Sequence, residues 1–197
     1  MRNGSLIVTN GIFNAKKRLQ VSYGSGVGTV TLAGTGTITA ETGIQLSQAS
    51  DGTLNLNGGI LNTANIQTFV NVSTNSSPGI VYYNGTMINP TLATTDFIPF
   101  YTNVTNMLMV GGAKFNLGGY NGTNYSITVA ANLLSGTNND GGLSLTNSAS
   151  GGPATLTLTG SNSYVGGTTI NGSNATLLLG NANALGATNG LLNVAAG

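Results

Sequence analysis

The sequence predicts an all-β fold, a right-handed parallel β-helix (β-solenoid) of about eight coils with about 24 residues in each. Two observations support this prediction: an internal repeat of strand-like segments, and a composition in which Gly, Asn, Thr and Ser replace charged residues. Only 5% of the 197 residues are charged, which is far below a typical soluble domain, yet 40% are hydrophobic. A disordered chain shows the opposite balance. A solenoid tolerates this composition because its corners use Gly and Asn, and because stacked polar side chains form hydrogen-bond ladders.

The repeat is clearest in the first ninety residues. The segments GSLIV (4–8), GTVTL (28–32) and GTLNL (52–56) begin 24 residues apart, and GIVYY (79–83) starts a fourth coil. Alternate residues in each segment are apolar, as in a strand with one buried face. We therefore expect two inward columns of side chains, Leu6, Val30, Leu54 and Val81 in one, and Val8, Leu32, Leu56 and Tyr83 in the other.

Two further strands complete each predicted coil. The segments LQVS (19–22), IQLS (44–47) and VNVS (70–73) form a second recurring set, offset by 25 and then 26 residues. Between the two sets, a middle strand is marked by Ile12, Phe13, Ile38, Ile60 and Leu61. One corner recurs at four positions where we expect a left-handed backbone, Asn10, Gly34, Gly58 and Gly85.

The pattern changes after residue 89. We expect one continuous domain with regular coils over 1–89, an irregular aromatic-rich excursion over 90–112, and further coils over 113–197. The excursion carries an apolar cluster of Phe97, Phe100, Tyr101, Met107 and Met109. Such a cluster is either a patch for a ligand or partner, or packing against the flank of the solenoid, which we favour.

Residues 155–186 carry a more specific signal. They read TLTLTGSNSYVGGTTINGSNATLLLGNANALG, with three short β-type runs separated by Gly and Asn. The ordered strings SYVGGTTING and LLLGNANALG resemble the autotransporter-associated β-strand repeat of bacterial extracellular proteins. The upstream order FIP, VGGAKFNLGGYN and YSITVAANLLSG resembles the region before such repeats. The resemblance implies a rigid passenger segment on the bacterial cell surface or in an extracellular matrix.

Catalytic chemistry finds little support in the residues. The chain has no His and no Cys, and its four acids are Glu41, Asp51, Asp96 and Asp140. Glycoside hydrolysis needs two carboxyl groups about 5–9.5 Å apart, and with coils of about 25 residues no acid falls opposite another. The turn at Asp140 lacks the calcium-binding nonapeptide pattern, and the glycine-rich residues 24–28 lack phosphate-loop spacing and indicate a turn. We expect no enzymatic activity, no cofactor and no metal site.

Charge and hydropathy also restrict the partners. The net charge is +1 and the single basic cluster is Lys16, Lys17 and Arg18, so we expect no nucleic-acid partner. No segment approaches the roughly 20 apolar residues that span a bilayer, so this segment should not insert into a membrane. The first residues do not form a signal peptide, and an export signal would lie outside this sequence.

These observations favour a structural role, as an extracellular fibre, stalk or surface-display segment. An adhesin segment that binds carbohydrate or a host surface is the second class, and a non-catalytic part of a polysaccharide-active enzyme is the third. We also expect self-association by end-to-end stacking, with residues 191–194 of one copy beside residues 6–8 of the next. The residues assigned to this contact are Leu6, Val8, Leu191, Leu192 and Val194.

Overall fold

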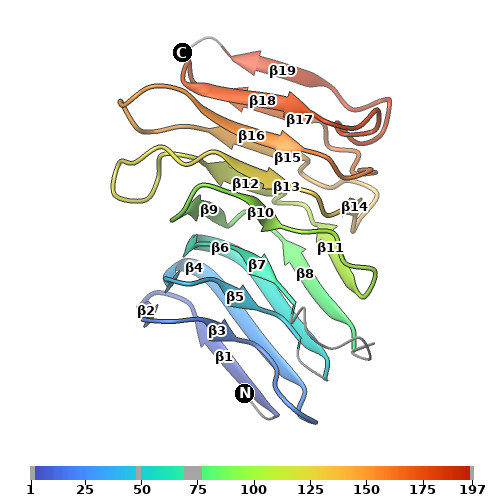
Figure 1. Ribbon diagram of the computed structural model, residues 1–197. Helices are drawn as coiled ribbons and strands as arrows, with labels where there is room; N and C mark the ends of the chain where they lie inside the picture. Colours follow the sequence, from blue (N-terminus) through green and yellow to red (C-terminus); the bar gives the residue numbers. More distant parts are fainter. Residues whose placement is uncertain (1–2, 48–49, 69–76, 196–197) are drawn as a thin grey trace.

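The computed structural model describes residues 3–47, 50–68 and 77–195. It is an all-β parallel β-solenoid of about seven turns, which confirms the predicted fold class (Figure 1). The prediction of about eight coils was slightly high because some coils are longer than 24 residues; Lys114, for example, lies opposite Ser144 in the next coil. Among the described residues no helix is long and apolar enough to cross a membrane.

The coils have three faces built from parallel strands; pairing is continuous along the second face, the first face ends at β14, and the third face consists of two separate sheets, β3–β7 and β10–β18. The first face contains β1 (Gly4–Val8), the first halves of β4 (Gly28–Ala40) and β6 (Gly52–Thr63), β8 (Gly79–Tyr83), β11 (Val104–Leu108) and β14 (Leu133–Ser135). The second face contains β2 (Ile12–Ala15), the second halves of β4 and β6, β9 (Met87–Pro90), β12 (Ala113–Asn116), β15 (Leu143–Thr146), β17 (Thr168–Asn171) and β19 (Leu192–Ala195). The third face contains β3 (Leu19–Gln20), β5 (Ile44–Gln45), β7 (Ile66–Gln67), β10 (Thr94–Ile98), β13 (Ile127–Val129), β16 (Ala154–Leu158) and β18 (Ala175–Leu179).

The strand registers confirm both predicted columns of the first face. Leu6 lies opposite Val30, and this column continues through Leu54 to Val81. The column that starts at Val8 continues in the same way to Tyr83. The inner members of both columns are fully buried, as expected for side chains that meet one residue per coil.

The second face carries the longest apolar column of the molecule. Successive registers place one inward residue per coil at a single position, Phe13, Ile38, Leu61, Ile88, Phe115, Leu145, Ile170 and Val194. Phe13, Ile38 and Leu61 belong to the middle strand that the sequence predicted. Of the second recurring set, 19–22 and 44–47 contain β3 and β5 on the third face, whereas 70–73 lies outside the described residues.

Glycine makes the corner between the first and second faces. Gly34, Gly58 and Gly85 have positive φ angles of 59°, 101° and 89°, as predicted. A Cβ on Gly34 would lie 2.8 Å from the carbonyl oxygen of Thr9 in the coil below, so the site is also too close for a larger residue. The prediction for Asn10 was wrong, because Asn10 does not have a positive φ. Its side chain instead accepts a hydrogen bond from Thr35 Oγ1 at 3.2 Å.

Residues 90–112 are part of the stack, which corrects the expected irregular excursion. They contain β10 and β11, and β11 pairs with β8 in register over five residues. Pro90 ends β9 and Pro99 directly follows β10, so both prolines lie where strands stop, as expected for a residue without a backbone N–H. Phe97 fills the core, where its ring meets that of Phe115 edge-on at 6.4 Å.

Outside the core, polar side chains repeat from coil to coil. Asn89 Nδ2 donates to Asn62 Oδ1 at 2.9 Å, and Asn62 Nδ2 donates to Thr39 Oγ1 at 3.1 Å. Asn55 Nδ2 reaches Thr31 Oγ1 at 3.1 Å on the first face. These ladders bind adjacent coils without charge, as the composition suggested.

We expect Leu56→Asp to lower the free energy of unfolding by about 3–5 kcal/mol, because it places an unpaired carboxylate between stacked coils. Asn55→Asp is the matched control on the opposite side of the same strand, and it should cost less than about 1 kcal/mol. Urea unfolding followed by circular dichroism measures both variants. Equal losses would show that the inward and outward positions are wrongly assigned.

Candidate functional site

The four acids do not form a catalytic pair. Glu41 follows β4, Asp51 precedes β6, and Asp96 lies in β10, so each is on a different part of the surface. Asp140 is buried between β14 and β15. In the described ranges there is no group of three or more side chains of the kinds that bind metal ions.

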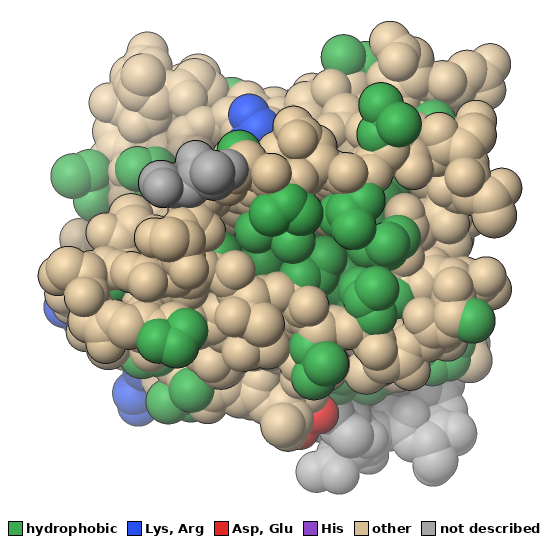
Figure 2. All heavy atoms as spheres, turned by 90° about the horizontal axis from the view of Figure 1, so that it is seen from above, with side chains coloured by type: hydrophobic (Ala, Val, Ile, Leu, Met, Phe, Trp, Pro, Cys, Tyr) green, Lys and Arg blue, Asp and Glu red, His purple; other side chains and the backbone are tan. Residues whose placement is uncertain are grey.

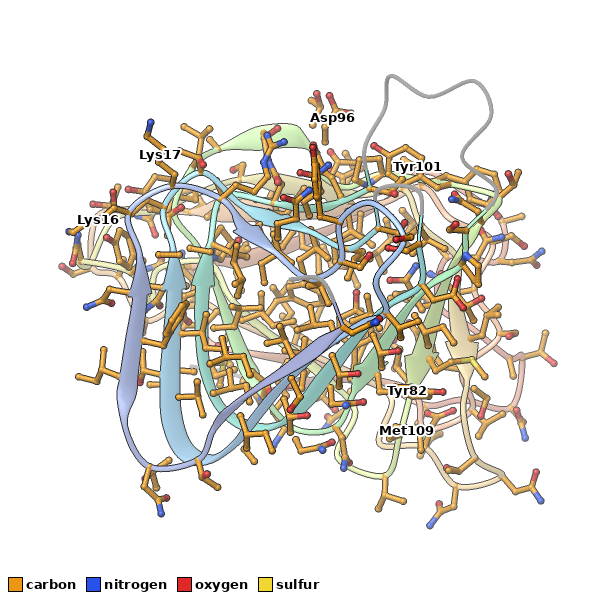
Figure 3. The ribbon with its side chains drawn as sticks, turned by 90° about the horizontal axis from the view of Figure 1, so that it is seen from below. Lys16, Lys17, Tyr82, Asp96, Tyr101 and Met109 are labelled. Carbon is orange, nitrogen blue, oxygen red and sulfur yellow. The ribbon has the colours of Figure 1, made fainter. Side chains whose placement is uncertain are left out.

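The basic cluster is exposed. Lys16 Nζ donates to Glu41 Oε1 at 3.0 Å across one coil, and this hydrogen bond and the carboxylate charge raise the pKa of Lys16. The Lys16 side chain remains 83% exposed, so the pair contributes little to stability. Figure 3 shows Lys16 and Lys17 at the edge of the molecule, pointing away from it. This is the arrangement of a solvated corner.

Asp140 is the one acid with an organised environment. Its Oδ1 accepts hydrogen bonds from the N–H groups of Gly142 and Gly166, both at 2.9 Å, and its Oδ2 accepts one from Val165 at 2.8 Å. Burial by itself would raise the pKa of Asp140, but the Ser135 side chain and these three N–H groups outweigh burial, and the pKa is lowered. The carboxylate therefore connects two neighbouring coils at a glycine-rich corner.

The sequence did not reveal this role, because the only recognised pattern for a lone acid before two glycines is that of a calcium-binding turn. The partners at 165 and 166 lie one coil away, so only the register of the coils places them at Asp140. Asp140 therefore has a structural role, in which its carboxylate joins two neighbouring coils.

The aromatic cluster predicted over 97–109 is divided. Phe97 is buried in the core, whereas Phe100 is 53% exposed and lines a pocket of about 300 Å³ with Tyr101, Asn132 and Leu134. Burial, followed by the charge of Asp96, raises the pKa of Tyr101. The three residues contributed by the later coil, Ala131, Asn132 and Leu134, were not predicted, because the pocket exists only where one coil lies on the next.

The two methionines lie on the first face. Met107 is opposite Tyr82 on one side and Leu134 on the other. Met109 follows β11, where its N–H donates to the carbonyl of Tyr83 at 2.8 Å, and Figure 3 shows it far from Tyr101. The structure therefore brings Phe100 and Tyr101 together and does not bring Met109 to them.

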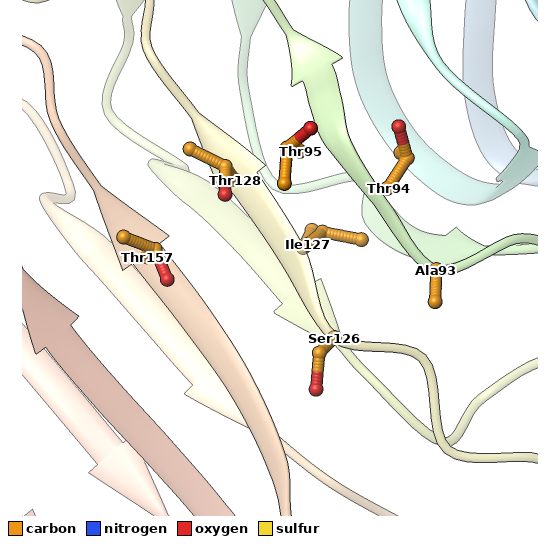
Figure 4. A pocket seen from close by; sticks show the side chains of 7 residues that line it. All are labelled: Ala93, Thr94, Thr95, Ser126, Ile127, Thr128 and Thr157. Atoms are coloured by element: carbon orange, nitrogen blue, oxygen red, sulfur yellow. The ribbon is translucent and has the colours of Figure 1, made fainter.

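A second hollow, of about 590 Å³, lies on the third face between β10, β13 and β16. Figure 4 shows it to be lined mainly by small hydroxyl side chains, with Ala93 and Ile127 beside Thr94, Thr95, Ser126, Thr128 and Thr157. These groups can form hydrogen bonds, but the lining holds neither an acid nor a base, so it offers no general acid–base chemistry.

Comparison with known proteins gives no match to a family model, a curated protein or a solved structure. The resemblance to the autotransporter-associated repeat therefore stays a prediction.

We expect the melting temperature to be nearly constant from about pH 5 to 9 and to fall on both sides. The folded-state pKa of Asp140 is lowered, so its stabilisation is present above pH about 4 and is lost as the pH falls below that value. Burial raises the pKa values of Tyr83, Tyr101 and Tyr164, so their contribution is lost as the pH rises above about 10. Calorimetric scans across pH measure the profile.

Between pH 5 and 9, Asp140→Asn should lower the free energy of unfolding by about 1–3 kcal/mol, because an amide cannot accept all three N–H bonds, and it should flatten the acid limb of the profile. The control is Asp51→Asn, which makes the same change of charge at an exposed position and should leave the free energy of unfolding between pH 5 and 9 unchanged. A steep loss of stability inside pH 5–9, or an unchanged acid limb in Asp140→Asn, would contradict this assignment.

Proposed function

We propose that this chain is a non-enzymatic structural β-solenoid, a rigid segment of an extracellular fibre, stalk or surface-display (passenger) protein. The observation that supports this most is the unbroken core, in which one inward residue per coil continues along the second face from Phe13 to Val194. A stack that is packed throughout resists bending, because strand pairing on the second face joins every coil to the next from β2 to β19.

The surface supports the same role. Its coils are joined by amide and hydroxyl ladders, the titratable groups are scattered, and the Asp140 carboxylate is occupied by backbone N–H groups. A location outside a bacterial cell is part of the proposal and rests on the resemblance of residues 155–186 to the autotransporter-associated repeat.

Tandem fusion tests the spacer role. If two copies are joined so that coils continue in register, the maximum dimension from small-angle X-ray scattering should increase by about 4.8 Å for each added coil. A maximum dimension that does not increase in this way, as expected for two domains joined flexibly, would contradict a rigid spacer.

Release of reducing ends from a panel of acidic and neutral polysaccharides by the purified chain would contradict the non-enzymatic assignment.

A second candidate function, glycan binding, is favoured by the pocket at Phe100 and Tyr101. An exposed aromatic ring beside the Asn132 amide and the hydroxyls of Thr102 and Thr105 is suited to a neutral sugar, whose C–H face stacks on the ring. If this function is correct, Phe100→Ala should lower binding on a glycan array by about tenfold, while Leu92→Ala, an exposed residue outside the pocket, should not. The absence of any glycan bound by the wild-type chain would exclude it.

A further inference from the structure

The C-terminal end of the stack exposes apolar core positions. Figure 2 looks onto this end and shows a contiguous group of hydrophobic side chains at its centre. Val194 is 65% exposed although it occupies the inward column of the second face, and Leu192 is 52% exposed two residues earlier on β19. Ile170 and Leu177, in the coil below, are only partly buried. These are side chains that a further coil would cover.

The N-terminal end has a hollow of matching character. A groove of about 460 Å³ runs between β1 and β2 and is lined mainly by apolar side chains, among them Leu6, Val8 and Phe13. Leu6 and Phe13 are partly buried members of the core, so the groove opens onto the apolar interior of the first coil. Both ends of the molecule thus present apolar side chains, a contiguous group at the C-terminal end and a groove at the N-terminal end.

The registers determine how these two ends would meet. Phe13 is the first residue of the second-face column and Val194 is the last, so β2 and β19 are the two terminal strands of the same face. The sequence suggested that residues 191–194 lie beside residues 6–8. The topology revises that pairing, because β1 begins the first face and β19 ends the second.

We propose that copies of this chain bind head to tail, with β19 of one copy paired in parallel with β2 of the next. This inference rests on the proposed structural function and specifies the partner and the contact. Continuing the register places Phe13 of the second copy on Val194, and Ile12 beside Asn193. Such a contact uses two different surfaces and leaves one of each free, so it propagates into a filament.

Charge does not oppose the contact. Residues 141–195 contain no Asp, Glu, Lys or Arg, so the basic cluster at 16–18 of the second copy meets a neutral end. The attraction is then burial of apolar area and pairing of strand edges, and neither is weakened by salt. We expect association to persist at 0.5 M NaCl, a salt concentration at which the Debye length is below about 8 Å.

Engineered cysteines test the register directly, because the chain contains no Cys. Ile12→Cys combined with Asn193→Cys places one thiol at each end, about 34 Å apart in one molecule at seven strand spacings, so a disulfide can form only between copies. We expect a ladder of covalent multimers on a non-reducing gel. Ile7→Cys with Asn193→Cys tests the alternative pairing with β1 and should give none. Equal ladders from the two pairs would overturn the proposed register.

Sedimentation with a matched pair of variants tests the interface itself. Val194→Lys should weaken association by about tenfold or more, because it buries an ammonium group in the contact. Val110→Lys changes the same residue type at nearly the same exposure, 66% against 65%, but away from both ends, and should leave association unchanged. Wild-type chain that stays monomeric at millimolar concentration, or Val194→Lys that assembles like wild type, would overturn the proposal. A chain that is rigid but stays monomeric would overturn the head-to-tail contact and leave the proposed spacer role unaffected, because the tandem fusion tests that role separately.

Discussion

The structure depends on one repeated contact, the stacking of an inward side chain on its equivalent in the coil below. Parallel strand pairing fixes this contact, because the backbone hydrogen bonds between coils bring residues at one position into line. A coil that gains residues must therefore gain them at a corner. The 30-residue step from Lys114 to Ser144 shows this, since the strands at both ends of it keep their register.

The scarcity of charge follows from the same geometry. In a stack, identical positions lie about 4.8 Å apart, so a repeated charge would repel its own copy in every coil. Asn, Gln and Thr avoid this, because each can donate to one neighbour and accept from the other, as Asn62 does between Thr39 and Asn89. Asp140 is compatible with the stack because three backbone N–H groups surround its single charge.

A spacer and a filament subunit have the same physical requirement, a core whose cross-section is constant along its length. The ends of this stack differ from its flanks in that respect: the flanks are mostly polar, and the ends expose columns that are buried elsewhere. The pocket at Phe100 shows that a binding site can be added to a flank. The turn between β10 and β11 can change its residues without disturbing the buried columns behind it.

The sequence by itself determined the coil period, the three strands of the early coils and the inward columns. It could do so because side chains alternate along a strand and recur once per coil, so pattern and packing coincide at Val30 and Leu54. It did not determine the place of residues 90–112, since bulky Phe97 and two prolines look like an interruption until Phe115 is seen facing the ring. Nor could it show the role of Asp140 or the face to which β19 belongs. Those depend on how corners of unequal length bring residues about 25 positions apart together, and only the tertiary structure decides that.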